Sequence, residues 1–88
     1  MTYTVVLERE EDGRYTVSVP ALEGCISWGD TVEHALAMAR DAIAVFVEHL
    51  EAHGLPVPTD DPRVTVDVSE ATQVVVTRVT VGEAAAVA

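Results

Sequence analysis

The sequence contains no lysine and only one cysteine, and each of these two shortages excludes some classes of protein. Its five basic residues are all arginines and stand against 15 acidic residues, which gives a formal net charge of -10 over 88 residues. Most of such a surface would repel the phosphates of nucleic acids and of anionic membranes. A basic protein is the simplest electrostatic complement of this chain.

The single cysteine, Cys25, cannot form an internal disulfide, which is typical of a reducing compartment such as the cytoplasm. No apolar stretch approaches the ~20 residues that span a bilayer. The first residues lack a basic region and reach charge at Glu8, so we expect no signal peptide. The length allows one small domain. We expect it to span residues 1–81, with residues 82–88 as a frayed tail.

Two alternating apolar and polar segments, at residues 3–9 and 14–19, have the two-residue period of half-buried strands. An Asp-Gly step ending at Gly13 lies between them and predicts a hairpin, because glycine accepts the positive φ of such a turn. Pro20 ends the second segment, since proline has no N–H to give to a sheet. Residues 25–28 are short and β-prone, and predict a third antiparallel strand.

A long amphipathic helix follows these strands. Its start fits a capping box of Asp30 with Glu33, while Thr31 is a competing N-cap for which His34 is a poor third member. Its end is predicted at Gly54, because glycine is the usual residue just past a helix. The i, i+3, i+4, i+7 stripe that should face the sheet comprises Val32, Ala35, Leu36, Ala39, Ile43, Phe46, Val47 and Leu50.

Two further strands are predicted after a proline-rich connector at residues 55–62. Residues 63–68 alternate, and residues 73–81 are rich in β-branched side chains. Whether both join the main sheet stays open. The fold class is therefore α+β: three antiparallel strands, one long helix, then one or two strands (β-β-β-α-β), with the helix on one face of the sheet.

A single helix covers only one face of a sheet, so the other face needs cover or must be polar. We expect Val6, Val75 and Val79 on that uncovered face. A valine-rich last strand at a sheet edge would also be prone to pairing with another chain. Both features favour an edge-to-edge or face-to-face homodimer, or a higher homo-oligomer.

The residues that could carry chemistry are isolated from one another. The carboxylates of residues 8–12 are typical of a solvated turn. His49 and His53, spaced i, i+4, could share a metal ion, but no third ligand is evident and a helix C-terminus favours histidine anyway. Cys25 could be a nucleophile or a small buried side chain. No phosphate-binding glycine motif is present. We therefore predict no catalytic residue, no cofactor and no metal, and not an enzyme.

A Val-Pro-Ala-Leu-Glu-Gly-Cys string at residues 19–25 is followed by Gly-Asp-Thr at residues 29–31 and by the helix. Together with the hairpin, this combination resembles the HicB-like antitoxin family from Tyr3 to Pro58. The resemblance implies a partial ribonuclease-H-like fold of sheet order 3-2-1-4, with the strand after the helix parallel to the first. His34 stands where the family usually has glutamate, which would weaken only the helix cap.

Members of this family neutralise HicA-like toxins, which are small basic messenger-RNA interferases. The resemblance implies a cytoplasmic antitoxin that binds such a toxin by direct contact; the alternative is an orphan homo-oligomeric module, a scaffold or small-ligand binder without a toxin. Many members also carry a C-terminal helix-turn-helix or ribbon-helix-helix segment, which we do not find after Pro62, so we expect no direct DNA binding. The hypothesised partner interface comprises Trp28, Glu33, Asp41, Glu48 and Glu51.

Overall fold

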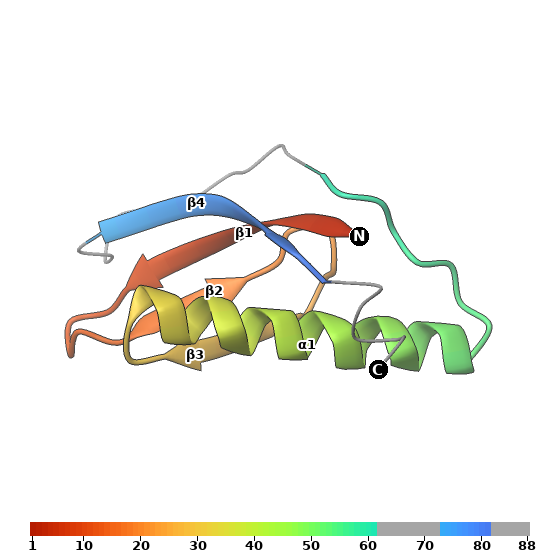
Figure 1. The fold of residues 1–88 in the computed structure, drawn as a ribbon, viewed down its shortest axis with the longest axis horizontal. Coiled ribbons are helices and arrows are strands. Elements are labelled where there is room, and N and C mark those ends of the chain that lie inside the picture. Colours follow the sequence, from red (N-terminus) through yellow and green to blue (C-terminus); the bar gives the residue numbers. More distant parts are fainter. Residues whose placement is uncertain (62–72, 82–88) are drawn as a thin grey trace.

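The computed structural model describes residues 1–61 and 73–81, which form a four-stranded sheet with one long helix on one face (Figure 1). In chain order the elements are β1 (Thr2–Arg9), β2 (Tyr15–Ser18), β3 (Ile26–Gly29), α1 (Val32–Ala52) and β4 (Gln73–Thr80). This order and the sheet order β3-β2-β1-β4 confirm the predicted fold class. The strand predicted at residues 63–68 and the tail predicted at residues 82–88 lie outside the described residues.

A short turn joins β1 to β2. The N–H of Glu10 donates to the carbonyl of Arg14 (2.8 Å), and the N–H of Gly13 donates to the carbonyl of Glu10 (3.0 Å). Gly13 has a φ of 90°, as the sequence predicts. The Asp12 carboxylate accepts hydrogen bonds from the backbone N–H and the Nε of Arg14, and these bonds lower the pKa of Asp12. The acidic hairpin is therefore an exposed turn that is stabilised by its own hydrogen bonds.

The connector after α1 is tied to β1 by hydrogen bonds. The Tyr3 hydroxyl donates to the carbonyl of Pro58 (2.6 Å). The Asp60 carboxylate accepts the backbone N–H of Thr4 (2.7 Å) and the Thr4 hydroxyl (2.9 Å). β2 does not pair with β1 at the level of Thr4. Asp60 therefore supplies the acceptor that a neighbouring strand would otherwise give.

β4 runs antiparallel to β1, so the parallel direction that the family resemblance implied is wrong for this strand. The path of the connector explains the difference. Asp60 lies beside Thr4, near the start of β1, whereas the first residue of β4, Gln73, pairs with Arg9 at the end of β1. β4 therefore begins at the opposite end of β1 from Asp60 and runs back toward the start of β1.

Helix α1 begins after Thr31, so the preference for Asp30 as the N-cap was wrong. The Thr31 hydroxyl accepts the N–H of His34 (3.0 Å), and the Nδ1 atom of His34 accepts the N–H of Asp30 (3.0 Å). In a capping box, a glutamate side chain at this position accepts the N–H of the N-cap residue. Here the imidazole of His34 accepts the N–H of the residue before the N-cap instead. The prediction that His34 weakens the cap did not consider that its ring nitrogen can accept a hydrogen bond.

The other end of α1 is closed by a glycine, as predicted. Gly54 has a φ of 66° and donates its N–H to Glu51, while the N–H of Leu55 donates to the carbonyl of Leu50 (2.9 Å). This pair of bonds is a Schellman motif, which satisfies carbonyls at the helix end. Within the described residues, no helix is both long enough and apolar enough to cross a membrane.

The hydrophobic core lies between α1 and the inner face of the sheet. Its largest fully buried side chains are Tyr3, Leu7, Leu22, Ile43, Val5, Val17 and Val79. The register pairs Val79 with Tyr3 and Val75 with Leu7, so both valines face α1 and the prediction that placed them on the uncovered face was wrong. An unbroken valine run has no alternation from which the register could be read. Val6 does lie on the outer face, away from α1, but only 3% of its surface is exposed, so the outer face is not uncovered at this position.

Candidate functional site

β3 forms one edge of the sheet and, among the described residues, has a strand on one side only. The N–H of Val19, the residue after β2, donates to the carbonyl of Cys25 (3.1 Å), so the carbonyl of Cys25 points toward the β2 side of the strand, while its N–H bonds to Leu22. These groups alternate along a strand, which directs those of Ser27 toward β2 and those of Ile26 and Trp28 away from the sheet. β3 therefore offers N–H and C=O groups to a further strand at Ile26 and Trp28.

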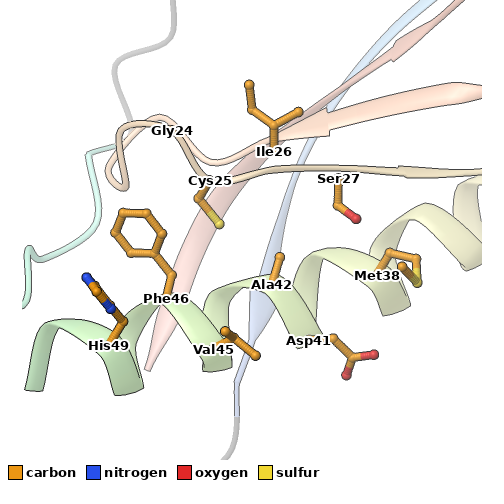
Figure 2. Close-up of a pocket in the computed structure, with 10 residues that line it drawn as sticks. All are labelled: Gly24, Cys25, Ile26, Ser27, Met38, Asp41, Ala42, Val45, Phe46 and His49. Carbon is orange, nitrogen blue, oxygen red and sulfur yellow. The ribbon is translucent and has the colours of Figure 1, made fainter. Parts of the chain in front are cut away.

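The side chains of β3 alternate between the two faces of the sheet. Cys25 and Ser27 are buried on the helix side, whereas Ile26 and Trp28 are 50% and 58% exposed. Figure 2 shows Ile26 pointing away from α1 while Cys25 points toward it. Two large apolar side chains exposed on an edge strand indicate a binding surface, because a free edge of this kind pairs readily with another chain.

On the helix side of β3, an open groove of about 560 Å³ runs between the strand and α1 (Figure 2). Ten residues line it: Gly24, Cys25, Ile26, Ser27, Met38, Asp41, Ala42, Val45, Phe46 and His49. Met38 and Val45 project from α1 and are 37% and 67% exposed. Apolar side chains are therefore exposed on both sides of the same strand edge.

The close approach of β3 to α1 depends on a glycine. A Cβ atom added to Gly29 would lie 2.3 Å from the backbone nitrogen of Ala35, so no larger residue fits without moving the helix. At the other end of the strand, the N–H of Cys25 donates to the carbonyl of Leu22 (2.9 Å) in a tight turn. The two ends together fix β3 against the helix.

Cys25 belongs to the hydrophobic core at the side of the groove. Only 4% of its surface is exposed, and burial raises the pKa of its thiol. A raised pKa disfavours the thiolate, which is the nucleophilic form of cysteine. The structure thus favours packing over nucleophilic chemistry for this residue.

The four acidic residues of the hypothesised interface are exposed on one side of α1, and we call them the acidic helix face: Glu33, Asp41, Glu48 and Glu51. At about 100° per residue, they fall within a sector of about 80° directed away from the core. Arg40, which is also exposed, lies about 20° outside this sector and borders it. The helix therefore presents four negative charges and one positive charge on a continuous surface.

The structure does not bring Trp28 to the acidic helix face. Trp28 lies on the outer face of the sheet, and α1 covers the opposite face. Asp41 is nearest to the strand of the four acids, because it also lines the groove beside Ser27. The five predicted residues therefore belong to two surfaces, one on the helix and one at the β3 edge.

His49 and His53 lie side by side at the end of α1, with ring centroids 4.2 Å apart. The Nδ1 atom of His53 lies 2.9 Å from the carbonyl oxygen of His49, so this ring bonds to the helix terminus. No group of three or more histidine, cysteine, aspartate or glutamate side chains suited to a metal ion occurs within residues 1–61 and 73–81. The contacts of His49 and His53 are therefore those of side chains that pack at the end of a helix.

The sequence-based prediction did not include the exposed residues Met38 and Val45 in a functional site. Neither belongs to the predicted core stripe or to the charged side of the helix. They are seven residues apart and thus lie on one side of α1. A pair of apolar residues at this spacing outside the core stripe was the signal that could have revealed them.

Comparisons with known proteins identify a family. The family model described as the HicB_like antitoxin of bacterial toxin-antitoxin system matches residues 3–85. A UPF0150 protein of Thermoplasma acidophilum is 43% identical over 61 residues, which cover 69% of this chain and 88% of that protein. Antitoxin HicB 1 of Photorhabdus laumondii is 40% identical over 78 residues, which cover 84% of this chain and 50% of that antitoxin.

Solved structures give the same result. The N-terminal domain of Burkholderia pseudomallei antitoxin HicB superposes with a TM-score of 0.70 at 28% identity, covering 93% of this chain and 99% of that domain. A chain from a HicA3 and HicB3 toxin-antitoxin complex superposes with a TM-score of 0.66 at 26% identity, covering 91% of this chain and 96% of that chain.

Proposed function

The chain belongs to the HicB-like antitoxin family of bacterial toxin-antitoxin systems, and from this premise we propose that it neutralises a small, basic HicA-like messenger-RNA interferase by direct contact. Such a toxin acts on cytoplasmic RNA, so we place the protein in the cytoplasm. We assign no catalytic residue to it: an antitoxin of this kind works by covering its partner. A related chain comes from a complex described as HicA3 with HicB3, which supports a partner of this type.

The acidic helix face is the observation that carries this proposal. It concentrates Glu33, Asp41, Glu48 and Glu51 on one exposed side of α1, in a chain whose formal net charge is -10. A basic RNA-binding surface has the complementary charge. Opposite charges on facing surfaces raise the association rate and the selectivity of a complex.

The test is binding to the protein encoded beside the gene for this chain, which the proposal expects to be short and basic. We expect a complex whose affinity falls as salt is raised, and rescue of growth when both proteins are co-expressed. The double variant Glu48→Lys/Glu51→Lys should bind at least about tenfold more weakly at low salt, given about 0.2–1 kcal/mol per exposed ion pair and the added repulsion.

The matched control is Glu11→Lys/Glu23→Lys, which makes the same change in net charge at exposed sites outside the helix. It should bind within about twofold of the unchanged protein if the acidic helix face makes the contact. An equal loss in both double variants would show that only overall charge matters. Absence of binding to the neighbouring protein at low salt would contradict the proposal.

The exposed Ile26 and Trp28 favour a second candidate, a homo-oligomeric HicB-like module without a toxin. The two functions differ in genome context and in partner. A stable homo-oligomer with no basic protein encoded nearby would support the second function, whereas capture of the neighbouring toxin would support the first.

A further inference from the structure

We propose that the free edge of β3 pairs with β3 of a second copy of this chain, so that two sheets join into one across a two-fold axis at Ser27. In this arrangement Ile26 lies opposite Trp28 of the partner subunit. This inference is independent of a toxin. It rests on the backbone of β3, on the side chains on both of its faces, and on a comparison with the other sheet edge.

The backbone of β3 is self-complementary in one register. Ile26 and Trp28 are the β3 residues whose N–H and C=O groups point away from β2. An antiparallel two-fold pair centred on Ser27 places Ile26 opposite the partner's Trp28, and Trp28 opposite the partner's Ile26. Residues that face each other in this way exchange both of their backbone hydrogen bonds. The pairing therefore satisfies the outward groups of both copies.

The outer-face side chains fit the same register. Ile26 and Trp28 are 50% and 58% exposed in one copy. Directly opposed residues of an antiparallel pair have Cβ atoms about 4.5–5.5 Å apart, so each tryptophan would pack on an isoleucine. Ser27, at the axis, faces the helix side with a small side chain. The register that satisfies the backbone thus also covers the largest exposed apolar groups of the strand.

The helix side contributes a second set of contacts. β3 runs antiparallel to α1, because Gly29 lies against Ala35 while Cys25 and Phe46 line the other end of the groove. Met38 and Val45 lie on either side of the middle of the strand. A two-fold axis at Ser27 therefore turns Met38 toward the partner's Val45.

These helix contacts matter because the strand pair is short. A four-residue strand pair alone buries less than the ~800 Å² per partner of a standard interface. The exposed apolar groups on α1 extend the contact surface on the helix side.

The edge at β4 is less suited to the same pairing. Val81 and Met1 exchange backbone hydrogen bonds, so the backbone groups of Val76 and Arg78 point outward. A two-fold pair between them would put the charged Arg78 opposite a valine. A charged side chain on an edge strand is a known protection against such pairing. Among the described residues, β3 is therefore the sheet edge whose outward-pointing positions carry no charged side chain.

The charge of the chain predicts how the dimer responds to salt. Two copies of formal charge -10 repel each other, and Asp41 lies at the groove near the axis. Screening by salt reduces this repulsion. The homodimer should thus become tighter as salt is raised, whereas a complex with a basic toxin should become weaker. The two interactions can be distinguished by the sign of this dependence.

The test uses the full chain without a partner. Sedimentation over about 1–100 µM protein should show a concentration-dependent dimer. Trp28 is the only tryptophan, so its fluorescence reports the β3 edge directly. Its emission should shift to the blue over the same concentration range. A chain that stays monomeric at every concentration and salt level overturns the inference, as does a dimer with unshifted emission.

A matched pair of variants locates the interface. Ile26→Glu and Val76→Glu place the same charge on outer-face residues of equal exposure, 50% and 51%, at opposite sheet edges. The first should be monomeric with solvent-like Trp28 emission, and the second should remain a dimer. The reverse result overturns the inference. Far-UV circular dichroism checks that both variants are folded.

A backbone variant tests the hydrogen bonds themselves. Ile26→Pro removes an N–H that points away from β2, so it spares the bonds within the sheet. It should weaken the dimer at least tenfold while the chain stays folded. A dimer unchanged by both Ile26 variants contradicts strand pairing. Protection of Trp28 that appears only when the toxin is added would assign the edge to the toxin and also overturn the inference.

Discussion

Gly29 lies where β3 passes against the first turns of α1, and its missing side chain makes this contact possible. In Gly29→Ala the new Cβ would lie 2.3 Å from the backbone nitrogen of Ala35. We expect a loss of about 2–3 kcal/mol in the free energy of unfolding, because a helix backbone has to move. Urea unfolding followed by circular dichroism measures the loss.

The control for this variant is Gly24→Ala. Gly24 has a φ of 88°, but nothing lies within 4 Å of a Cβ added there. The substitution should therefore cost only about 1 kcal/mol through backbone strain. Equal losses at the two positions would mean that close packing does not explain the need for glycine at Gly29.

Tyr3 should make the protein less stable at high pH. Burial and the charge of Asp60 raise the pKa of its phenol above the ordinary value of 10.0. From about pH 10 the unfolded chain loses this proton first, so the free energy of unfolding falls by up to about 1.4 kcal/mol per pH unit until the folded phenol also ionises. Below that range the contribution is fully present. Unfolding experiments from pH 7 to 11 measure it.

Tyr3→Phe separates this effect from other alkaline changes. The variant should lose about 1 kcal/mol at pH 7, since the hydrogen bond to Pro58 is gone, but should fall less steeply above pH 10. Cys25 remains and acts in the same direction, because burial raises its pKa too. An unchanged slope in Tyr3→Phe would remove Tyr3 as the cause.

At the scale of the element, the start of α1 tests the unusual cap. Thr31→Ala should lower the free energy of unfolding by about 1 kcal/mol, because the N–H of His34 loses its acceptor. His34→Ala should cost less, since it removes only the acceptor for Asp30. His34→Glu should keep the stability of the unchanged chain by forming an ordinary capping box. Thermal unfolding of the three variants gives the order, and equal midpoints would contradict a role for the ring.

Local elements could be predicted from the sequence because their signals lie within a few residues. The hairpin depends on Gly13 and the helix end on Gly54, and both have the positive φ expected of them. The direction of β4 could not be predicted, because it depends on where the connector is held by Asp60, far from β1 in sequence. The predicted faces of Val75 and Val79 were wrong for the same reason, because strand register depends on contacts between residues that are far apart in the sequence.

In the candidate site, too, features set by neighbouring residues could be predicted, and features set by long-range contacts could not. The exposure of Glu33 and Glu48 could be predicted from helix periodicity alone. That Trp28 lies on the other face from these acids could not, because it needs the pairing of β3 with β2 and the position of α1. The groove beside Met38 also arises only when the strand and the helix are brought together.

For the whole molecule, the two proposed surfaces differ in position and in chemistry. The acidic helix face is charged and points away from the core, whereas the β3 edge is apolar and carries its largest exposed side chains on the opposite face of the sheet. Pairing through β3 would leave Glu33, Glu48 and Glu51 accessible in each copy. A dimer could therefore hold two basic partners, one on each helix.

Excess negative charge should also limit the stability of the fold itself. With 15 acidic against five basic residues, repulsion favours the expanded chain, and salt screens it by shortening the Debye length from about 30 Å at 10 mM to about 10 Å at 100 mM. We expect the free energy of unfolding to rise by roughly 1 kcal/mol over this range, about the contribution of one exposed ion pair. Glu48→Lys/Glu51→Lys reduces the formal charge from -10 to -6, so its salt response should be smaller. Urea unfolding of both proteins, at one concentration because association adds to stability, checks this, and an equal or larger response in the variant would show that repulsion is not the cause.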